Sequence, residues 1–317
     1  MRRRTVFAPL AVAGTALAAT PTAHAQQAWL PPKGEASLSL GFAHILATEH
    51  RNDRGDSVTP GDMIWNNVVS DLSYGVTDRL AVRLNVPFVT SRYGGAFPHR
   101  PVPERENLDD GNWHHTFQDL LTEVRFRATR GPLVLTPFAA MIVPTHYYEY
   151  YGHGAAGRKL VEGQVGVVAG RLLDPFLPNA YVQVRYVLGI PEKVLGVSHN
   201  RSQLSFDVGY LLGSAFSVRA FGTWQKTHGG WRAPIDFPAP TSSEFRVHDQ
   251  VGRADYLRLG GAVSYSITGS LDVNVSGYGT LAAKNDVNMS GLGLSLTWSA
   301  SPAQLIRKRR GQEDETP

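Results

Sequence analysis

Apolar and small polar residues alternate along the segment 289–298, which reads Met-Ser-Gly-Leu-Gly-Leu-Ser-Leu-Thr-Trp. Successive side chains of a β-strand point to opposite faces, so one face of this segment carries leucine and tryptophan while the other carries glycine, serine and threonine. The same alternation recurs in the segments 79–90, 202–212, 256–267 and 270–281. The pattern indicates an all-β protein whose strands have one apolar face and one polar face.

The first 25 residues are typical of a secretory signal peptide. Three arginines at positions 2–4 form a positive start, a mainly apolar run covers 6–19, and residues 23–25 read Ala-His-Ala, the form that signal peptidase cleaves. The mature chain is therefore expected to begin at Gln26. A short membrane anchor is the alternative, but the apolar run is shorter than the roughly 20 residues that cross a bilayer.

Charge and cysteine content narrow the class further. The full chain has a formal charge of +4, and removal of residues 1–25, which hold three arginines and no acid, leaves +1. This small charge predicts no nucleic-acid partner. The chain has no cysteine, so an exported protein of this kind must be held by other means, such as the hydrogen-bond ladder of a closed sheet. The sequence has no run of about 18 apolar residues, so no helical membrane span is expected.

Twelve segments are expected to form strands, and each reaches the roughly 9–11 residues that a tilted membrane strand needs. They are 35–47, 65–76, 79–90, 117–128, 132–144, 160–171, 179–188, 202–212, 215–225, 256–267, 270–281 and 289–299.

The connections between these segments alternate in length. Short turns are expected at 77–78, 129–131, 173–178, 213–214 and 268–269. Longer loops are expected at 48–64, 91–116, 145–159, 189–201, 226–255 and, shortest of the set, 282–288. Outer-membrane barrels have short periplasmic turns and long extracellular loops, and an even strand number puts both termini on the periplasmic side.

The expected fold is thus an antiparallel transmembrane β-barrel of about twelve strands. Backbone in hydrocarbon must satisfy all its hydrogen bonds internally, and a closed barrel does this without leaving an edge. A soluble all-β domain is the alternative fold, but it gives no reason for loop lengths to alternate so regularly.

Four short motifs resemble the outer-membrane barrel family named for the MetA pathway of phenol degradation. Residues 74–80 read Tyr-Gly-Val-Thr-Asp-Arg-Leu, 84–88 read Leu-Asn-Val-Pro-Phe, Asp119 opens a strand, and 143–145 read Val-Pro-Thr at a strand end. The resemblance covers mainly residues 35–225. It implies a barrel that admits small hydrophobic or aromatic compounds.

Two positions depart from the family pattern. Gln118 stands where the family often has glycine before the aspartate, and His146 stands where glycine usually follows Pro-Thr.

Charged residues collect on the polar face of the expected strands. Because a charge facing lipid at mid-depth costs about 2–4 kcal/mol for Arg or Lys, this face is expected to line the lumen. The set comprises Asp71, Arg83, Asp119, Glu123, Arg125, Arg127, Glu162, Arg185, Asp207, Arg219, Arg258 and Asp272. Six acids against six bases predict weak or absent ion selectivity. The charges either guide a solute or simply pair and fill a narrow interior.

Nine of the eleven histidines fall in expected long loops. The pair His114-His115, and His146 with His153, are candidates to meet above the barrel, where imidazoles bind divalent metals. No metal-ligand motif supports this, so no metal and no other cofactor is expected.

A surface hydrolase is an alternative function, because Asp109 and Asp110 lie in the same loop as His114. The sequence shows no nucleophile motif, so no catalytic residue is expected.

Aromatic residues and long loops mark the mouth of the barrel. Residues 147–151 read Tyr-Tyr-Glu-Tyr-Tyr and are expected to join the outer aromatic girdle. The loop 226–255 is the first candidate for a plug or lid and the loop 91–116 is the second, because long aromatic loops of barrels often fold inward.

The expected organisation is a signal peptide over 1–25, a barrel over 26–300, and a polar, charge-segregated tail over 301–317 that stays unfolded in the periplasm. The expected location is the outer membrane of a Gram-negative cell. The expected function is passive uptake of a small, hydrophobic or aromatic compound. The partners would be that solute, membrane lipid and the barrel-assembly machinery. A barrel with a plugged lumen and a structural role is the remaining alternative.

Overall fold

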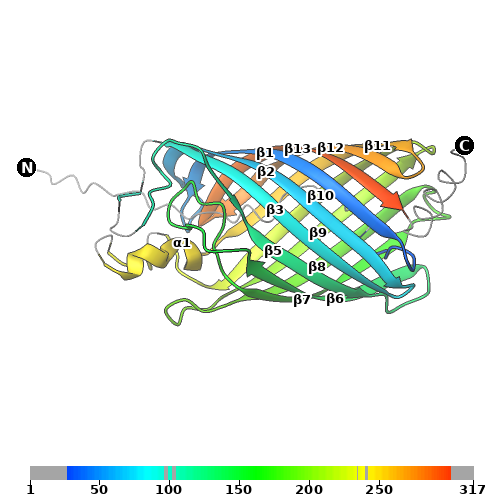
Figure 1. Cartoon of the computed structure of the whole chain (residues 1–317), viewed down its shortest axis with the longest axis horizontal. Coiled ribbons are helices and arrows are strands. Elements are labelled where there is room, and N and C mark those ends of the chain that lie inside the picture. The colour runs from blue at the N-terminus through cyan, green and yellow to red at the C-terminus, as the bar shows by residue number, and fades with distance from the viewer. Residues whose placement is uncertain (1–26, 96–98, 102–104, 234, 240–241, 301–317) are drawn as a thin grey trace, which may run out of the picture.

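The protein is a closed antiparallel β-barrel (Figure 1). The computed structural model describes residues 27–95, 99–101, 105–233, 235–239 and 242–300. The expected signal peptide and the expected charged tail over 301–317 lie outside these residues.

Thirteen strand segments make up the sheet. They are β1 (Ala36–Arg51), β2 (Ser57–Thr77), β3 (Leu80–Gly95), β4 (His114–Phe117), β5 (Asp119–Phe126), β6 (Leu133–Pro144), β7 (Glu162–Leu172), β8 (Ala180–Pro191), β9 (His199–Leu212), β10 (Phe216–Gly229), β11 (Asp255–Thr268), β12 (Leu271–Lys284) and β13 (Asp286–Ala300). β4 and β5 follow one another along β3 and form one stave that is interrupted at Gln118, so the barrel has twelve staves, as the sequence predicts.

The barrel closes where the first strand meets the last. β1 pairs antiparallel with β13 from Ala36 opposite Ala300 to Arg51 opposite Asp286, with a bulge near Ala47. Every other ladder joins strands that follow one another in the chain, counting β4 and β5 as one stave. The closed ladder leaves the sheet without an open edge, as a membrane-spanning sheet requires.

The outer surface is apolar, and the burial alternates as the sequence predicts. In β13, Leu292, Leu294 and Leu296 are exposed, while Gly291 and Ser295 face inward and are buried. Large apolar side chains stay exposed on strand after strand, which a water-soluble surface seldom tolerates. The closed sheet therefore has the surface of a barrel that is surrounded by lipid.

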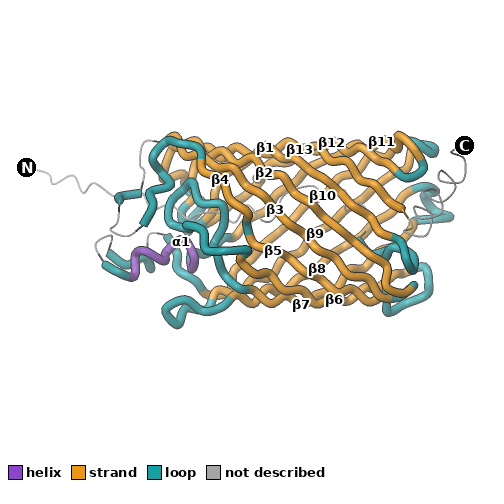
Figure 2. The backbone as a smooth tube through the Cα atoms, in the orientation of Figure 1, coloured by secondary structure: helices purple, strands orange, loops and turns teal. Residues whose placement is uncertain are grey.

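The two ends of the barrel differ (Figure 2). One end, the short-turn end, carries tight connections such as 78–79, 213–215 and 269–270. The other end, the long-loop end, carries the connections 96–113, 145–161, 192–198 and 230–254 and the short helices η2 (Glu244–Val247) and α1 (His248–Val251). No helix among the described residues is long and apolar enough to span a membrane.

Two expected loops are mostly strand. The expected loop 48–64 shrinks to 52–56, because β1 and β2 continue to pair far beyond the clean alternation. The expected loop 282–288 shrinks to a turn at Asn285, whose positive φ of 50° reverses the chain between β12 and β13. These expectations were wrong because pairing with the neighbouring strand, and not local polarity, decides where these strands end. The polar residues that were predicted to be loop continue the ladder.

Candidate functional site

The middle of the barrel wall carries a cluster of inward-facing charges. Arg83 forms an ion pair with Asp71 at 2.7 Å. Glu123 on β5 accepts from Arg185 on β8 at 2.5 Å and lies 3.4 Å from Arg125. Because β6 and β7 separate β5 from β8 in the sheet, the Glu123–Arg185 pair reaches across the curve of the wall rather than between neighbours.

The structure buries seven of the twelve residues that the sequence analysis assigned to the lumen and half-buries the other five. The buried ones are Asp71, Asp119, Glu123, Arg125, Glu162, Asp207 and Arg258, and the half-buried ones are Arg83, Arg127, Arg185, Arg219 and Asp272.

Some of these twelve residues pair with each other, and others find partners outside the set. Asp207 pairs with Arg219 at 2.8 Å. Asp119 accepts from the Tyr148 hydroxyl at 2.5 Å, and Asp272 accepts from Ser266 at 2.5 Å.

Two further pairs use residues that the sequence analysis missed. Glu162 pairs with Arg201, and Arg258 pairs with Asp286 at 2.8 Å. Arg201 and Asp286 were missed because both fell in segments read as loops. The ladders of β9 with β8 and of β13 with β1 include them, and their side chains face inward.

The connection 145–161, called here the inserted loop, folds into the barrel. Its Ala155 and Ala156 are buried. Three inward-facing side chains donate to its backbone carbonyls: Trp65 Nε1 to Ala155 at 3.2 Å, Ser91 Oγ to Gly154 at 2.5 Å and Gln118 Nε2 to Ala156 at 2.6 Å. The inserted loop was not among the expected plugs, which were 226–255 and 91–116, and it bonds directly to the wall at these three side chains. Residues 248–251 of the expected plug 226–255 are buried as well.

The tyrosines of this loop do not form an outer girdle. Tyr148, Tyr150 and Tyr151 are buried, and only Tyr147 is strongly exposed. Tyr148 accepts from the Lys159 backbone N–H at 2.9 Å while its own hydroxyl donates to the wall. The girdle interpretation was wrong for these three rings because the loop turns inward at the end of β6 and takes them with it.

One side of the inner wall beside the inserted loop is apolar. This apolar wall comprises Ala43, Ile45, Ala47, Met63, Trp65, Val89, Tyr93, Tyr278, Val287 and Met289, from β1, β2, β3, β12 and β13. Ala156 of the inserted loop packs against it. The interior near the long-loop end is therefore charged on one side and apolar and aromatic on the other.

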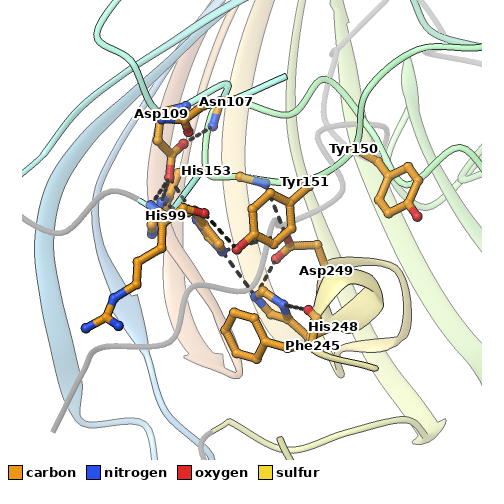
Figure 3. A network of polar contacts seen from close by, with 12 residues as sticks. His99, Asn107, Asp109, Tyr150, Tyr151, His153, Phe245, His248 and Asp249 are labelled. Atoms are coloured by element: carbon orange, nitrogen blue, oxygen red, sulfur yellow. Dashed lines mark hydrogen bonds and ion pairs between the residues drawn. The ribbon is translucent and has the colours of Figure 1, made fainter. Parts of the chain in front are cut away.

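Three long connections meet in a buried histidine and aspartate network (Figure 3). His99 Nδ1 lies 2.8 Å from Asp109 Oδ2 and 3.0 Å from His153 Nδ1. His99 Nε2 lies 3.1 Å from His248 Nε2, and His248 Nε2 lies 3.1 Å from Asp249 Oδ1. The network joins the connection 96–113 to the inserted loop and to α1.

The network perturbs the pKa values of its members. Burial favours the neutral imidazole of His99, but the nearby Asp249 and Asp109 carboxylates outweigh it and raise its pKa. Burial dominates at His153 and lowers its pKa. Burial, with the charges of Asp249 and Asp109, raises the pKa of Tyr151 to about 12.

The expected histidine pairs do not form. His153 contacts His99, whereas His146 contacts Thr116 at 3.0 Å. His114, the first residue of β4, lies 2.9 Å from Asp110. Asp109 and Asp110 thus serve different histidines. Sequence spacing could not predict this network, because its members come from three loops that are far apart in the chain.

A short N-terminal segment occupies the short-turn end of the interior. Ala28 is fully buried, and it accepts from Thr136 Oγ1 at 2.7 Å and donates to Gln183 Oε1 at 3.1 Å. Trp29 packs edge-on to Tyr181 with ring centroids 6.2 Å apart. Nothing in the sequence pattern indicated that this segment enters the barrel.

The connection 230–254 also links the two sides of the closing ladder. The backbone N–H of Ala233 donates to Asn285 Oδ1, in the turn between β12 and β13, at 2.8 Å. Its carbonyl accepts from the backbone of Asp53, between β1 and β2, at 3.2 Å.

The closed sheet, the apolar outer surface and the inward charges together define a β-barrel of the outer-membrane type. Among solved structures, the fold is similar to an outer membrane channel from Pseudomonas putida F1, with a TM-score of 0.64 and 12% identity over 86% of this chain and 97% of that chain. The likeness shows the shared fold.

Two porins match more weakly. NanC porin has a TM-score of 0.48 and 8% identity over 82% of this chain and 98% of that one. KdgM porin has a TM-score of 0.45 and 6% identity over 82% and 98%. No protein-family model and no curated protein matches the sequence.

Proposed function

We propose that the protein is an outer-membrane channel for a small molecule and that the inserted loop sets the width of its lumen. The long-loop end would then face outward and the short-turn end the periplasm, as in barrels of this class. The observation that supports the proposal is the direct bonding of the inserted loop to Trp65, Ser91 and Gln118, which holds backbone inside the barrel at a defined place.

The charged residues would line the path with little preference for one ion sign. Nine of the twelve have an oppositely charged partner within 4 Å, inside or outside the set, so the wall presents few uncompensated charges to a passing solute. An unpaired ring of one sign would instead select ions.

The apolar wall favours a hydrophobic or aromatic solute. Trp65 and Tyr93 contact the inserted loop from β2 and β3, and aromatic and apolar linings of this kind are typical of sites that bind flat rings. This choice of solute also agrees with what the resemblance to the phenol-degradation family implies.

Single-channel recording tests the role of the loop. A variant in which residues 150–158 are replaced by a short glycine and serine linker should conduct more than the wild type. A matched variant with the exposed turn 193–197 replaced in the same way should conduct as the wild type does. Equal conductance of all three proteins would refute the assignment of the constriction.

The same recordings test the solute. An aromatic alcohol that enters the lumen should interrupt the ionic current briefly and repeatedly, and a sugar alcohol of similar size should not. Interruptions by the sugar alcohol alone would contradict the proposed solute class. A wild-type barrel that conducts no ions, and conducts none after the loop is replaced, would favour a structural barrel.

A further inference from the structure

We infer that His99, His248 and Asp249 form a binding site for a divalent transition metal, with zinc the best fit. His99 comes from the connection 96–113, and the other two open α1 in the connection 230–254. All three residues are buried. Two imidazoles and a carboxylate are ligands that zinc takes at sites with an open position.

The distances agree with tetrahedral coordination. His99 Nε2 and His248 Nε2 lie 3.1 Å apart, His248 Nε2 and Asp249 Oδ1 lie 3.1 Å apart, and His99 Nε2 lies 3.7 Å from Asp249 Oδ2. Ligands at about 2.0–2.1 Å from a tetrahedral zinc lie about 3.3–3.4 Å from one another. The two imidazoles contact different oxygens of Asp249. One carboxylate oxygen and the two Nε2 atoms lie within 4.8 Å of one another, so a rotation of the carboxylate would bring one oxygen toward both imidazoles.

Hydrogen bonds orient both imidazoles for this role. The His248 Nδ1–H donates to the Phe245 carbonyl at 2.5 Å, which leaves the Nε2 lone pair directed at His99 and Asp249. His99 Nδ1 faces the Asp109 carboxylate at 2.8 Å, so a proton on Nδ1 leaves Nε2 as its donor atom. An imidazole held by a carboxylate or carbonyl on one nitrogen and by metal on the other is the usual arrangement at zinc sites.

The carboxylate is held as well. Asp249 Oδ2 accepts from the Gly152 backbone N–H in the inserted loop at 3.1 Å. The metal would therefore be positioned by all three long connections, and its two positive charges would be offset by Asp249 and Asp109.

The neighbouring group of His99, Asp109 and His153 fits a metal less well. Its donor atoms lie only 2.5–3.0 Å apart, which is further from the roughly 3.3–3.4 Å between tetrahedral zinc ligands than the 3.1–3.7 Å of the proposed site. We assign Asp109 the role of a positioning residue that orients His99.

Three protein ligands leave a fourth position for water or a solute atom. The Tyr151 ring stands edge-on to both imidazoles, 4.8 Å from His99 and 6.0 Å from His248 between centroids, and lies beside the site. Bound metal would tie the connection 96–113 to α1 above the inserted loop and stiffen the cover of the lumen.

Calorimetry on the full-length barrel in detergent tests the site with zinc alone, and the visible spectrum of bound Co²⁺ tests its geometry. The wild type should bind one zinc at micromolar concentration or tighter, and Co²⁺ should give the intense bands of a tetrahedral site. Both His248→Gln and Asp249→Asn should weaken zinc binding at least tenfold, and Asp109→Asn should weaken it about 10–100-fold.

His114→Gln is the matched control, because His114, the first residue of β4, also lies near two carboxylates but outside the proposed site. It should bind zinc as the wild type does. Each variant is first shown to be folded by the altered gel mobility of an unheated barrel. No heat with zinc, an octahedral Co²⁺ spectrum, or binding lost only in His114→Gln would overturn the inference. None of these results depends on whether the barrel conducts a solute.

Discussion

The carboxylate of Glu123 should be essential to the middle of the barrel, and Glu123→Gln tests this. The side chain is 1% exposed and pairs with Arg185, whose side chain is 13% exposed. The local cluster holds two carboxylates, Glu123 and Asp71, and three guanidiniums, Arg83, Arg125 and Arg185. The substitution leaves Asp71 alone against all three.

The expected loss in unfolding free energy is about 3–5 kcal/mol, because removing one partner of a buried pair strands the other charge. The same change should make the lumen select for anions, since the local excess of positive charge rises from one to two. Urea unfolding of the refolded protein measures the first effect. The reversal potential across a salt gradient in a planar bilayer measures the second.

Asp236→Asn is the matched control. It removes the carboxylate from an exposed ion pair, in which the Arg232 side chain is 44% exposed and the Asp236 side chain 32% exposed. Because water replaces the lost partner, neither the urea midpoint nor the reversal potential should change. A loss of less than about 1 kcal/mol in Glu123→Gln, together with the wild-type reversal potential, would refute the role given to this carboxylate. That result would mean that the cluster is as well solvated as a surface pair.

Three further substitutions test the outer face, the inserted loop and the N-terminal segment. Leu294→Arg puts a charge on the exposed apolar face and should lower the unfolding free energy in lipid vesicles by about 2–4 kcal/mol. Tyr148→Phe removes the hydroxyl that donates to Asp119 and should cost about 1–3 kcal/mol in urea unfolding. Gly170→Val should expel Ala28 from the barrel, because a Cβ at position 170 would lie 2.4 Å from the Ala28 Cβ. When Ala28→Cys is added, the new cysteine is the only thiol of the chain, and it should react with a maleimide once the segment has been expelled.

Each of these has a control or a contrary outcome. Tyr147→Phe changes an exposed ring of the same loop and should leave the urea midpoint unchanged. Equal stability of Leu294→Arg and wild type in vesicles would mean that this face does not meet lipid. Rapid labelling of Ala28→Cys in the barrel that keeps Gly170 would show that the segment does not stay inside.

The fold was accessible from the sequence because the strand period is local. Leu294 and Ser295 differ in polarity, and the structure exposes the first and buries the second. The ends of strands that continue past the alternating segments could not be predicted from the sequence. The pairing of His50 with Val287 and Thr59 depends on the neighbouring strands, since nothing in the local sequence there repeats with a period of two.

The candidate site was accessible only in part. The acids and bases of the inner face follow from the strand period, but their partners do not. Glu123 meets Arg185 only because the sheet curves back through two intervening strands. The contacts of His99 with His153 and His248 have sequence separations of 54 and 149. No local pattern links such residues, so the network becomes visible only when the loops are in place.

The ladder between β1 and β13 has a consequence for the order in which the barrel forms. The hydroxyls of Thr297 and Ser39, bonded at 3.1 Å across this ladder, are 258 residues apart in sequence, whereas the other ladders join consecutive staves. Contacts of long sequence separation form late, so this ladder should zip last. At the long-loop end Ala233 bridges both of its sides, while near the short-turn end the side-chain links are hydroxyl pairs such as Thr297 with Ser39. The ladder between β1 and β13 should therefore begin to open at the short-turn end, and that end should show the fastest amide hydrogen exchange in the ladder.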